Sequence, residues 1–195
     1  KISILEHCIG KADYVLLGGV MANTFLKAQG YNIGDSVYEQ EELHRAEKLL
    51  STSAVVLPLD VVVMGNSHHK THNSKFQYAV KPPQQVEAGE RIMDIGPETI
   101  RLYASYIRKA QTIIWNGPMG KFEQAPFSHG SVALGRFIAS RSKGKAFGMV
   151  GGGETIACLQ KTKMATFVDH VSTGGGAMLS FLAGEKLPGL QALEI

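Results

Sequence analysis

The sequence has little of several features that mark common protein classes. Its 195 residues include only two cysteines, Cys8 and Cys158, which lie in apolar helical patterns without paired spacing, so we expect buried, reduced thiols. No apolar run approaches the roughly 20 residues that a membrane span needs. A basic leader followed by an apolar stretch is missing as well. These absences predict a cytoplasmic protein without a membrane partner.

Charge of one sign is not in excess either. Lys and Arg total 20 against 17 Asp and Glu, which leaves a net charge of +3 and gives no basis for a nucleic-acid surface. Charged residues make up 19% and hydrophobic residues 44%, too apolar a balance for disorder. We therefore expect one folded domain, monomeric, in which any anion binding is local.

Glycine, by contrast, is abundant and clustered. Two triplets, Gly151–Gly153 followed by Glu154 and Thr155, and Gly174–Gly176 preceded by Ser172 and Thr173, each separate an apolar run from a helical pattern. Such loops let backbone N–H groups approach an anion, and the following helix adds the positive end of its dipole. Glycine runs also serve as plain turns, but two at matching junctions favour a crevice that binds phosphate.

The wider pattern alternates short apolar runs with longer helical segments. The runs predict strands over 14–17, 54–58, 92–95, 112–115, 146–150 and 167–171. The intervening segments predict helices over 22–28, 39–50, 97–109, 131–140 and 155–160. This order is typical of an α/β domain with three layers, a Rossmann-like fold with a mainly parallel β-sheet flanked by helices. In such a fold ligands bind beyond the carboxyl ends of the strands, where the glycines would converge.

One segment, between Met64 and Glu90, breaks this pattern. It is polar and contains two adjacent prolines, so we expect an irregular excursion or an edge hairpin there. His68, His69 and His72 in this segment have no accompanying carboxylate or cysteine and no helical pattern, and we assign no metal to them.

The segment after the run ending in Trp115 carries a second cluster of rigid residues. Asn116, Gly117 and Pro118 form a turn, and Glu123 follows shortly after. A fixed turn of this kind can pack against a flat ring, while a carboxylate can accept hydrogen bonds from sugar hydroxyls. The plainer interpretation is a turn with no ligand.

Several of these segments together resemble one known family. They are 115–123 (WNGPMGKFE), 94–97 (DIGP), 18–25 (GGVMANTF), 151–155 (GGGET), 172–177 (STGGGA) and 187–189 (LPG). Their order and spacing resemble those of phosphoglycerate kinase along nearly the whole chain. The resemblance covers residues 1–195 as the C-terminal, nucleotide-binding domain of that two-domain enzyme.

The resemblance implies reversible transfer of a phosphoryl group from 1,3-bisphosphoglycerate to MgADP, giving 3-phosphoglycerate and MgATP in glycolysis. In the family, the N-terminal substrate domain binds 3-phosphoglycerate, and that domain is absent from this sequence. The chain is therefore expected to bind ADP or ATP with Mg²⁺ but to be essentially inactive alone. Its opening at Lys1 suggests a piece of something longer.

The site residues implied by the resemblance fall into two groups. The catalytic group, which contacts the phosphates being transferred, comprises Lys1, Gly152, Gly174, Gly175 and Gly176. The nucleotide-binding group comprises Lys1, Gly18, Gly19, Asn116, Pro118, Glu123, Gly152, Gly153, Glu154 and Thr155. No side-chain nucleophile is required, because phosphoryl transfer depends on positioning and charge stabilisation.

Three positions depart from the usual pattern of the family. Glu154 stands where Asp normally helps to hold magnesium, and it remains the predicted metal ligand although its side chain is one methylene longer. Lys121 replaces a small aliphatic residue, and its side chain is expected to point into solvent. Ile92 occurs where glycine is common near the adenine.

Two alternatives remain at this point. One is a freestanding nucleotide-binding module without catalytic activity. The other is a dehydrogenase domain, which the alternating pattern alone would allow, but the sequence lacks the G-x-G-x-x-G turn after its first strand. The segment 187–195, which packs toward the other domain in the family, is expected to be loose.

Overall fold

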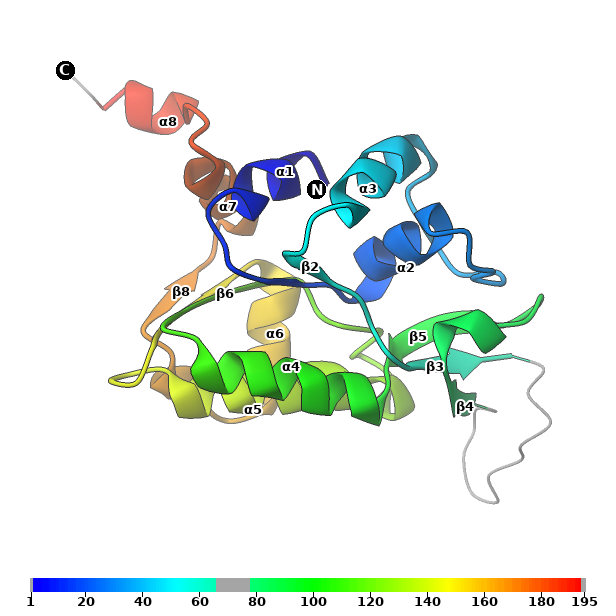
Figure 1. Ribbon diagram of the computed structural model, residues 1–195. Helices are drawn as coiled ribbons and strands as arrows, with labels where there is room; N and C mark the ends of the chain where they lie inside the picture. Colours follow the sequence, from blue (N-terminus) through cyan, green and yellow to red (C-terminus); the bar gives the residue numbers. More distant parts are fainter. Residues whose placement is uncertain (1, 66–77, 194–195) are drawn as a thin grey trace.

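Short apolar segments form two parallel sheets in the computed structural model, which describes residues 2–65 and 78–193 (Figure 1). In the first sheet β1 (Val15–Leu16) pairs with β2 (Val55–Val56). In the second, the order is β6 (Thr112–Asn116), β7 (Phe147–Gly151) and β8 (His170–Ser172). Each pair of parallel neighbours is connected through a helix, as a parallel crossover requires. The predicted parallel arrangement is therefore confirmed.

A third sheet is antiparallel. Its order is β4 (Tyr78–Lys81), β3 (Val61–Met64) and β5 (Arg91–Ile95). The described part of the segment between Met64 and Glu90 thus includes an edge strand, β4, that pairs with β3. This strand corresponds to the edge hairpin, one of the two structures predicted for the segment. Residues 68, 69 and 72 lie outside the described residues.

Helices cover both sides of the parallel strands (Figure 1). Helices α4 and α5 lie on one side, while α1, α2 and α3 lie on the other, so the three predicted layers are present. The α-helices are α1 (Ile2–Ile9), α2 (Gly19–Ala28), α3 (Leu43–Leu50), α4 (Pro97–Lys109), α5 (His129–Arg141), α6 (Gly153–Lys161), α7 (Gly175–Ala183) and α8 (Pro188–Gln191). Short 3₁₀ helices are η1 (Gln40–Glu42), η2 (Pro83–Gln85), η3 (Ala125–Phe127) and η4 (Ala165–Phe167).

Two buried clusters hold these layers together. The larger packs Trp115 and Val150 of the second parallel sheet against α4, α5 and α6, and the smaller packs α1, α2 and α3 around Phe25. Burying each large apolar side chain contributes roughly 1.5–3 kcal/mol. Tyr103 of α4 joins the layers, because its hydroxyl lies 2.6 Å from the carbonyl oxygen of Leu17 and 3.0 Å from that of Val56.

The start of α4 is fixed by a carboxylate from outside the helix. Asp60 accepts hydrogen bonds from the backbone N–H groups of Glu98 at 3.0 Å and Thr99 at 2.7 Å. Such a cap satisfies N–H groups that have no acceptor within the helix and is worth about 1 kcal/mol. It anchors β3, which follows Asp60, to the start of α4.

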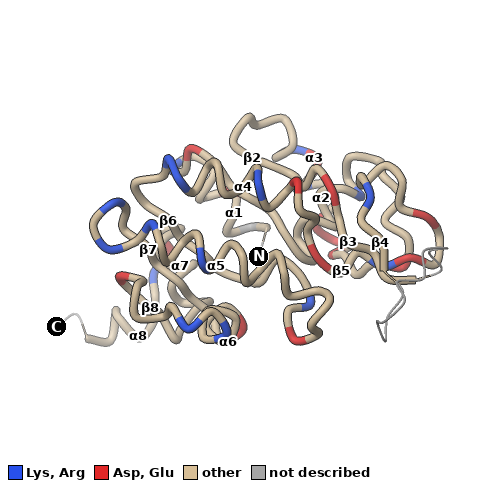
Figure 2. The backbone as a smooth tube through the Cα atoms, turned by 90° about the horizontal axis from the view of Figure 1, so that it is seen from below, with Lys and Arg blue, Asp and Glu red and all other residues tan. Residues whose placement is uncertain are grey.

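Charge is unevenly spread over the fold. Figure 2 shows Lys and Arg mainly toward β6 and β7, and more Asp and Glu toward α2, β3 and β5. Basic residues close the last turns of α4, α5 and α6, where they complement the helix dipoles. Part of the basic character thus comes from helix ends.

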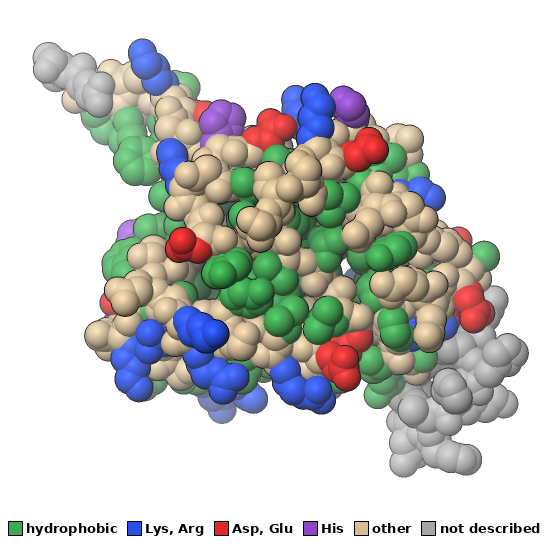
Figure 3. Space-filling view, viewed as in Figure 1, with side chains coloured by type: hydrophobic (Ala, Val, Ile, Leu, Met, Phe, Trp, Pro, Cys, Tyr) green, Lys and Arg blue, Asp and Glu red, His purple; other side chains and the backbone are tan. Residues whose placement is uncertain are grey.

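The remaining sequence expectations have mixed outcomes. Both cysteines are free; Cys158 is buried, as predicted, whereas Cys8 on α1 is only half-buried. Residues 188–193 are exposed, and α8 stands out from the rest of the molecule (Figures 1 and 3). None of the helices in the described ranges is long and apolar enough to cross a membrane.

Candidate functional site

Both glycine triplets connect a parallel strand to a helix, as the sequence predicted. Gly151 ends β7, Gly152 caps α6 with a φ of +93°, and Gly153 begins the helix. In the second triplet Gly174 precedes α7, which begins at Gly175. The first-turn N–H groups of α6 and α7 have no acceptor within their own helices, so both helix ends are suited to an anion.

The two loops touch through their backbones. A Cβ atom added at Gly175 would lie 2.4 Å from the Cα and 2.5 Å from the nitrogen of Gly152. The N–H of Gly152 also donates to the carbonyl oxygen of Ser172 at 3.2 Å. Glycine at position 175 is thus required by close approach, because any side chain would push the loops apart.

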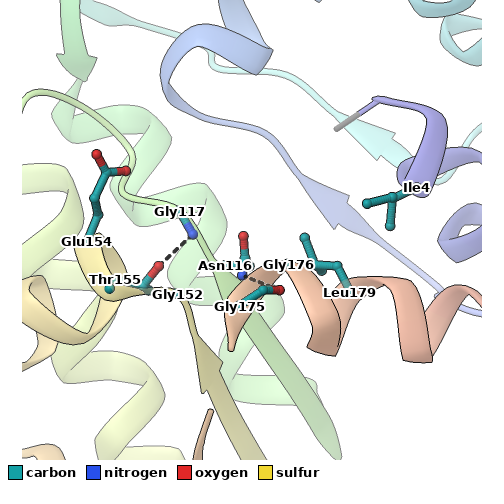
Figure 4. Close-up of a pocket in the computed structure, with 10 residues that line it drawn as sticks. Ile4, Asn116, Gly117, Gly152, Glu154, Thr155, Gly175, Gly176 and Leu179 are labelled. Carbon is teal, nitrogen blue, oxygen red and sulfur yellow. Dashed lines mark hydrogen bonds between the residues drawn. The ribbon is translucent and has the colours of Figure 1, made fainter. Parts of the chain in front are cut away.

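A cavity of about 270 Å³ opens in front of these loops (Figure 4). We call it the loop cavity. Its lining residues are Ile4, Asn116, Gly117, Gly152, Gly153, Glu154, Thr155, Gly175, Gly176 and Leu179. Most of its polar surface therefore comes from backbone and from three side chains, and Glu154 is the one ionisable residue among these ten.

Asn116 holds the two glycine loops together. Its Nδ2 donates to the carbonyl oxygen of Gly151 at 3.0 Å and to that of Gly175 at 3.4 Å (Figure 4). The family resemblance put Asn116 in the nucleotide-binding group. In the structure its amide Nδ2 is bonded to the two loops, and the residue lines both this cavity and a second one described below.

The turn after Asn116 is clamped from two directions. The N–H of Gly117 donates to the Thr155 hydroxyl at 2.7 Å, and the Gly117 carbonyl accepts from the Trp115 indole N–H at 2.8 Å. The Thr155 hydroxyl accepts in this bond, so its own hydrogen can be donated to a ligand. The turn is therefore fixed to the first turn of α6.

A second and larger cavity, of about 660 Å³, lies on the other side of this turn. We call it the side-chain cavity. It is lined by residues 16–21, 23, 36, 37, 39, 64, 91–94, 116–121, 123, 124 and 154. Its volume is in the range of small-molecule sites, about 300–1,000 Å³. Asn116, Gly117 and Glu154 line both cavities, which therefore share a wall.

Gly18 and Gly19 lie against Met119 at one side of the side-chain cavity. The N–H of Gly19 donates to the Met119 carbonyl at 2.9 Å, and Gly19 has a φ of +58°. A Cβ atom at Gly18 would lie 2.4 Å from Met119 Sδ. Met119 is held in turn by its N–H, which donates to the buried Ser131 hydroxyl at 2.8 Å. The start of α2 and the 116–119 turn are thus joined.

Asp94 is a buried carboxyl in the wall of the side-chain cavity, only 1% exposed. It accepts from the N–H of Gly130 at 2.8 Å, at the start of α5, and from its neighbour Ile95 at 2.9 Å. Burial raises the pKa of Asp94 to about 7, although these two hydrogen bonds act to lower it. The sequence gave Asp94 no role in the site.

Glu154 is the residue best placed to hold a magnesium ion. It is exposed in the first turn of α6 and lines both cavities. Groups of three or more His, Cys, Asp or Glu that could hold a metal are missing from the described ranges. Magnesium needs no such cage, because it retains several waters and binds through one or two carboxylates together with substrate phosphates. A single carboxylate beside two loops suited to anions fits this ion.

The structure brings most of the predicted residues together. Pro118 and Glu123 join Gly18 and Gly19 in the side-chain cavity. Gly152, Gly153, Thr155, Gly175 and Gly176 line the loop cavity. Gly174 caps α7 but does not line either cavity, and Lys1 lies outside the described residues.

The departures from the family pattern also lie at the site. Ile92 and Lys121 both line the side-chain cavity. Lys121 is exposed, and its N–H donates to the Met93 carbonyl at 2.8 Å. Sequence reasoning missed Ile4 and Leu179, which form the apolar side of the loop cavity; their only signal was an apolar pattern shared with core helices.

Fold and site together define a Rossmann-like α/β domain with two glycine loops that open onto a crevice of two adjoining cavities. The sequence model of the family described as Phosphoglycerate kinase matches residues 1–185. The chain therefore belongs to the phosphoglycerate kinase family.

Individual relatives agree with this assignment. The chain is 42% identical to a phosphoglycerate kinase of Chloroflexus aggregans over 199 residues, a match that covers 100% of this chain and 48% of the relative. The solved structure of phosphoglycerate kinase from Coxiella burnetii is similar with a TM-score of 0.86 at 40% identity, covering 99% of this chain and 49% of that one. The enzyme from Pyrococcus horikoshii OT3 has a TM-score of 0.80 at 33% identity. The chain spans about half the length of the relatives it matches.

Proposed function

We propose that residues 1–195 are the C-terminal, nucleotide-binding domain of a phosphoglycerate kinase and bind MgADP or MgATP. The observation that carries this proposal is the pair of adjoining cavities. One is lined by two helix N-termini suited to phosphates, and the other has the volume for a nucleoside. The complete enzyme would transfer a phosphoryl group between 1,3-bisphosphoglycerate and ADP.

In this proposal the nucleotide lies across the shared wall. The phosphates accept hydrogen bonds from the N–H groups of Gly153 and Gly176, and the Thr155 hydroxyl adds a further donor. The base and ribose occupy the side-chain cavity, where Glu123 accepts from the ribose hydroxyls. The arrangement orients the terminal phosphoryl group and stabilises its charge through fixed backbone dipoles.

Glu154 would hold the magnesium ion between the cavities. The ion would neutralise negative charge on the phosphates, which the described lining of the loop cavity does not offset with Lys or Arg. Because the substrate half of the family is a separate domain, the isolated chain is expected to bind nucleotide without transferring phosphoryl groups.

Calorimetric titration with ADP, with and without magnesium, tests this proposal. We expect saturable binding that weakens about tenfold in Glu154→Gln when magnesium is present, a loss of about 1.4 kcal/mol. Without magnesium the same variant should bind ADP at least as well as the original chain, because a repulsive carboxylate is gone. Glu185→Gln, an exposed carboxylate that lines neither cavity, is the matched control. Absence of ADP binding at millimolar concentration would refute the proposal.

A further inference from the structure

Lys161 is a charged residue near the site that the proposed function does not use. It ends α6, the helix that begins at the first glycine loop with Gly153, Glu154 and Thr155, and it lines neither cavity. With a rise of 1.5 Å per residue, about 12 Å of helix separates Lys161 from Gly153. Its role is therefore different from that of a phosphate ligand.

The ammonium group of Lys161 binds a neighbouring segment. Its Nζ donates to the carbonyl oxygen of Phe122 at 2.8 Å and lies 4.8 Å from the centroid of the Phe122 ring. The first contact is a charge-assisted hydrogen bond, and the second is a cation–π contact. Phe122 is only 4% exposed and belongs to the larger buried cluster. Lys161 thus binds the backbone of a residue whose own side chain is fixed in the core.

Residues 121–124 have few other links to the rest of the described chain. Among the described residues, two hydrogen bonds join this segment to elements distant in the sequence. One runs from Lys161 Nζ to Phe122, and the other runs from the N–H of Lys121 to the Met93 carbonyl at 2.8 Å. The remaining bonds, such as that from the N–H of Gln124 to the Lys121 carbonyl at 3.1 Å, are local. Loss of the lysine would leave the segment bonded to β5 alone.

Glu123 follows Phe122 directly and lines the side-chain cavity. It is exposed, and its carboxylate has no hydrogen bond or ion pair with the described residues. Burial raises the pKa of the Cys158 thiol on α6 to about 11, and among the smaller effects Lys161 lowers this pKa while Glu123 raises it. Both charges therefore lie near the same part of α6. The carboxylate is left for a ligand, while the backbone beside it is held by the lysine.

We propose that Lys161 is a positioning residue, which fixes the Phe122 carbonyl and so holds the Glu123 carboxylate where the ribose hydroxyls of a nucleotide can donate to it. This inference rests on the proposed function, since it assumes a nucleotide whose ribose lies at Glu123. A carboxylate held in place binds hydroxyls without first losing conformational freedom. Because α6 begins at the first glycine loop and ends at Lys161, the same helix also sets the distance between the phosphates and the ribose contact.

Calorimetric titration with ADP and with 2′,3′-dideoxy-ADP tests this role. The analogue lacks both ribose hydroxyls, so it fills the cavities without using Glu123. We expect the original chain to bind ADP about tenfold more tightly than the analogue in buffer that contains magnesium. Lys161→Met, which keeps the length of the side chain but removes the donor, should lower ADP affinity about fivefold and leave the affinity for the analogue unchanged. Lys163→Met changes an exposed lysine that lines neither cavity, and as the matched control it should alter neither affinity.

A double-mutant cycle with Glu123→Ala separates positioning from a general effect on the fold. If Lys161 acts through Glu123, then Lys161→Met should have no further effect on ADP affinity once Glu123 has been truncated. Lys161→Arg, which keeps a charged donor at this position, should retain the preference for ADP. An equal loss for ADP and the analogue in Lys161→Met would show that the lysine only stabilises the fold and would overturn the proposal. A loss in Lys161→Met that persists in the Glu123→Ala background would overturn it as well.

The outcomes also separate this inference from the proposed function. Binding of neither ADP nor the analogue would refute nucleotide binding itself. Tight but equal binding of both by the original chain would leave nucleotide binding intact and overturn the role of Lys161, because the ribose contact that it serves would be missing. This last comparison needs no variant, so a folding defect cannot obscure it.

Discussion

The two cavities of this domain are built in different ways. The loop cavity is walled mainly by the backbone of two glycine loops at the starts of α6 and α7. The side-chain cavity is assembled from segments around positions 16–23, 36–39, 91–94 and 116–124, which lie far apart in the sequence. The comparison teaches that glycine is indispensable in the loop cavity where two backbones meet, as Gly175 meets Gly152, whereas Gly176 of the same loop has open space beside it. In the side-chain cavity the atom nearest to a Cβ added at Gly18 is instead the side-chain sulfur of Met119.

Gly175→Ala should produce the largest effect and is confined to the loop cavity. Its methyl group would lie 2.4 Å from the Cα of Gly152, and backbone cannot move aside as a side-chain tip can. We expect ADP affinity to fall at least a hundredfold, with a loss of roughly 1–3 kcal/mol in the free energy of unfolding. Calorimetry and thermal unfolding measure the two quantities.

Gly176→Ala is the control for this change. It lies in the same loop, but a Cβ atom there would meet nothing within 4 Å. Comparable losses in both variants would show that the loop as a whole, rather than the contact between Gly175 and Gly152, limits binding.

Asp94, in the wall of the side-chain cavity, makes the stability of the fold sensitive to pH. Its pKa is raised from an ordinary value of 3.8 to about 7. Between these two pH values the folded chain therefore keeps a proton that the unfolded chain releases. The resulting stabilisation is complete below pH 3.8 and is lost as the pH rises through 7. Unfolding free energy should fall by about 1.4 kcal/mol per pH unit at the steepest point, relative to Asp94→Asn.

Denaturant unfolding at intervals between pH 4 and 8 measures this difference. Asn cannot titrate, so the variant removes the contribution of position 94 whatever its own stability. A difference between the two proteins that stays constant over this range would contradict the raised pKa of Asp94.

Gly18→Ala should have the smallest effect, on the side-chain cavity alone. The added methyl group would lie 2.4 Å from Met119 Sδ, a flexible atom, and 2.9 Å from the Met119 Cα. We expect adenosine affinity to fall about tenfold, or roughly 1.4 kcal/mol, because the Met119 backbone must also shift. Binding of magnesium pyrophosphate, which needs only the loop cavity, should not change. Gly10→Ala, in open space on the surface, is the control.

The sequence predicted the loop cavity better than the side-chain cavity for a physical reason. Glycine triplets at strand-to-helix junctions are local features, and helix 97–109 was predicted with the bounds of α4 because Pro97 and the basic final turn mark its ends. Strand β8 is shorter than the predicted 167–171, since 165–167 form a 3₁₀ turn. Strand β3 was not predicted, although its three consecutive valines are typical of a strand.

Other features depend on which segments meet in space. Asn116 was expected in the nucleotide-binding group, but its hydrogen bonds to both glycine loops follow from the alignment of β6, β7 and α7. The hydrogen bond from Lys161 to the Phe122 carbonyl follows from the position of residues 121–124 beside the end of α6. No pattern along the chain could reveal either of these features.

The hydrogen bond between Trp115 and Gly117 makes the fluorescence of Trp115 an intrinsic probe of the site. Trp115 is the sole tryptophan of the chain, and its indole N–H donates to the carbonyl of Gly117, one of three residues that line both cavities. All indole emission therefore originates beneath the junction of the two cavities. Movement of Gly117 would alter the hydrogen bonding of this fluorophore, so an unlabelled sample reports events at the junction through its intrinsic spectrum.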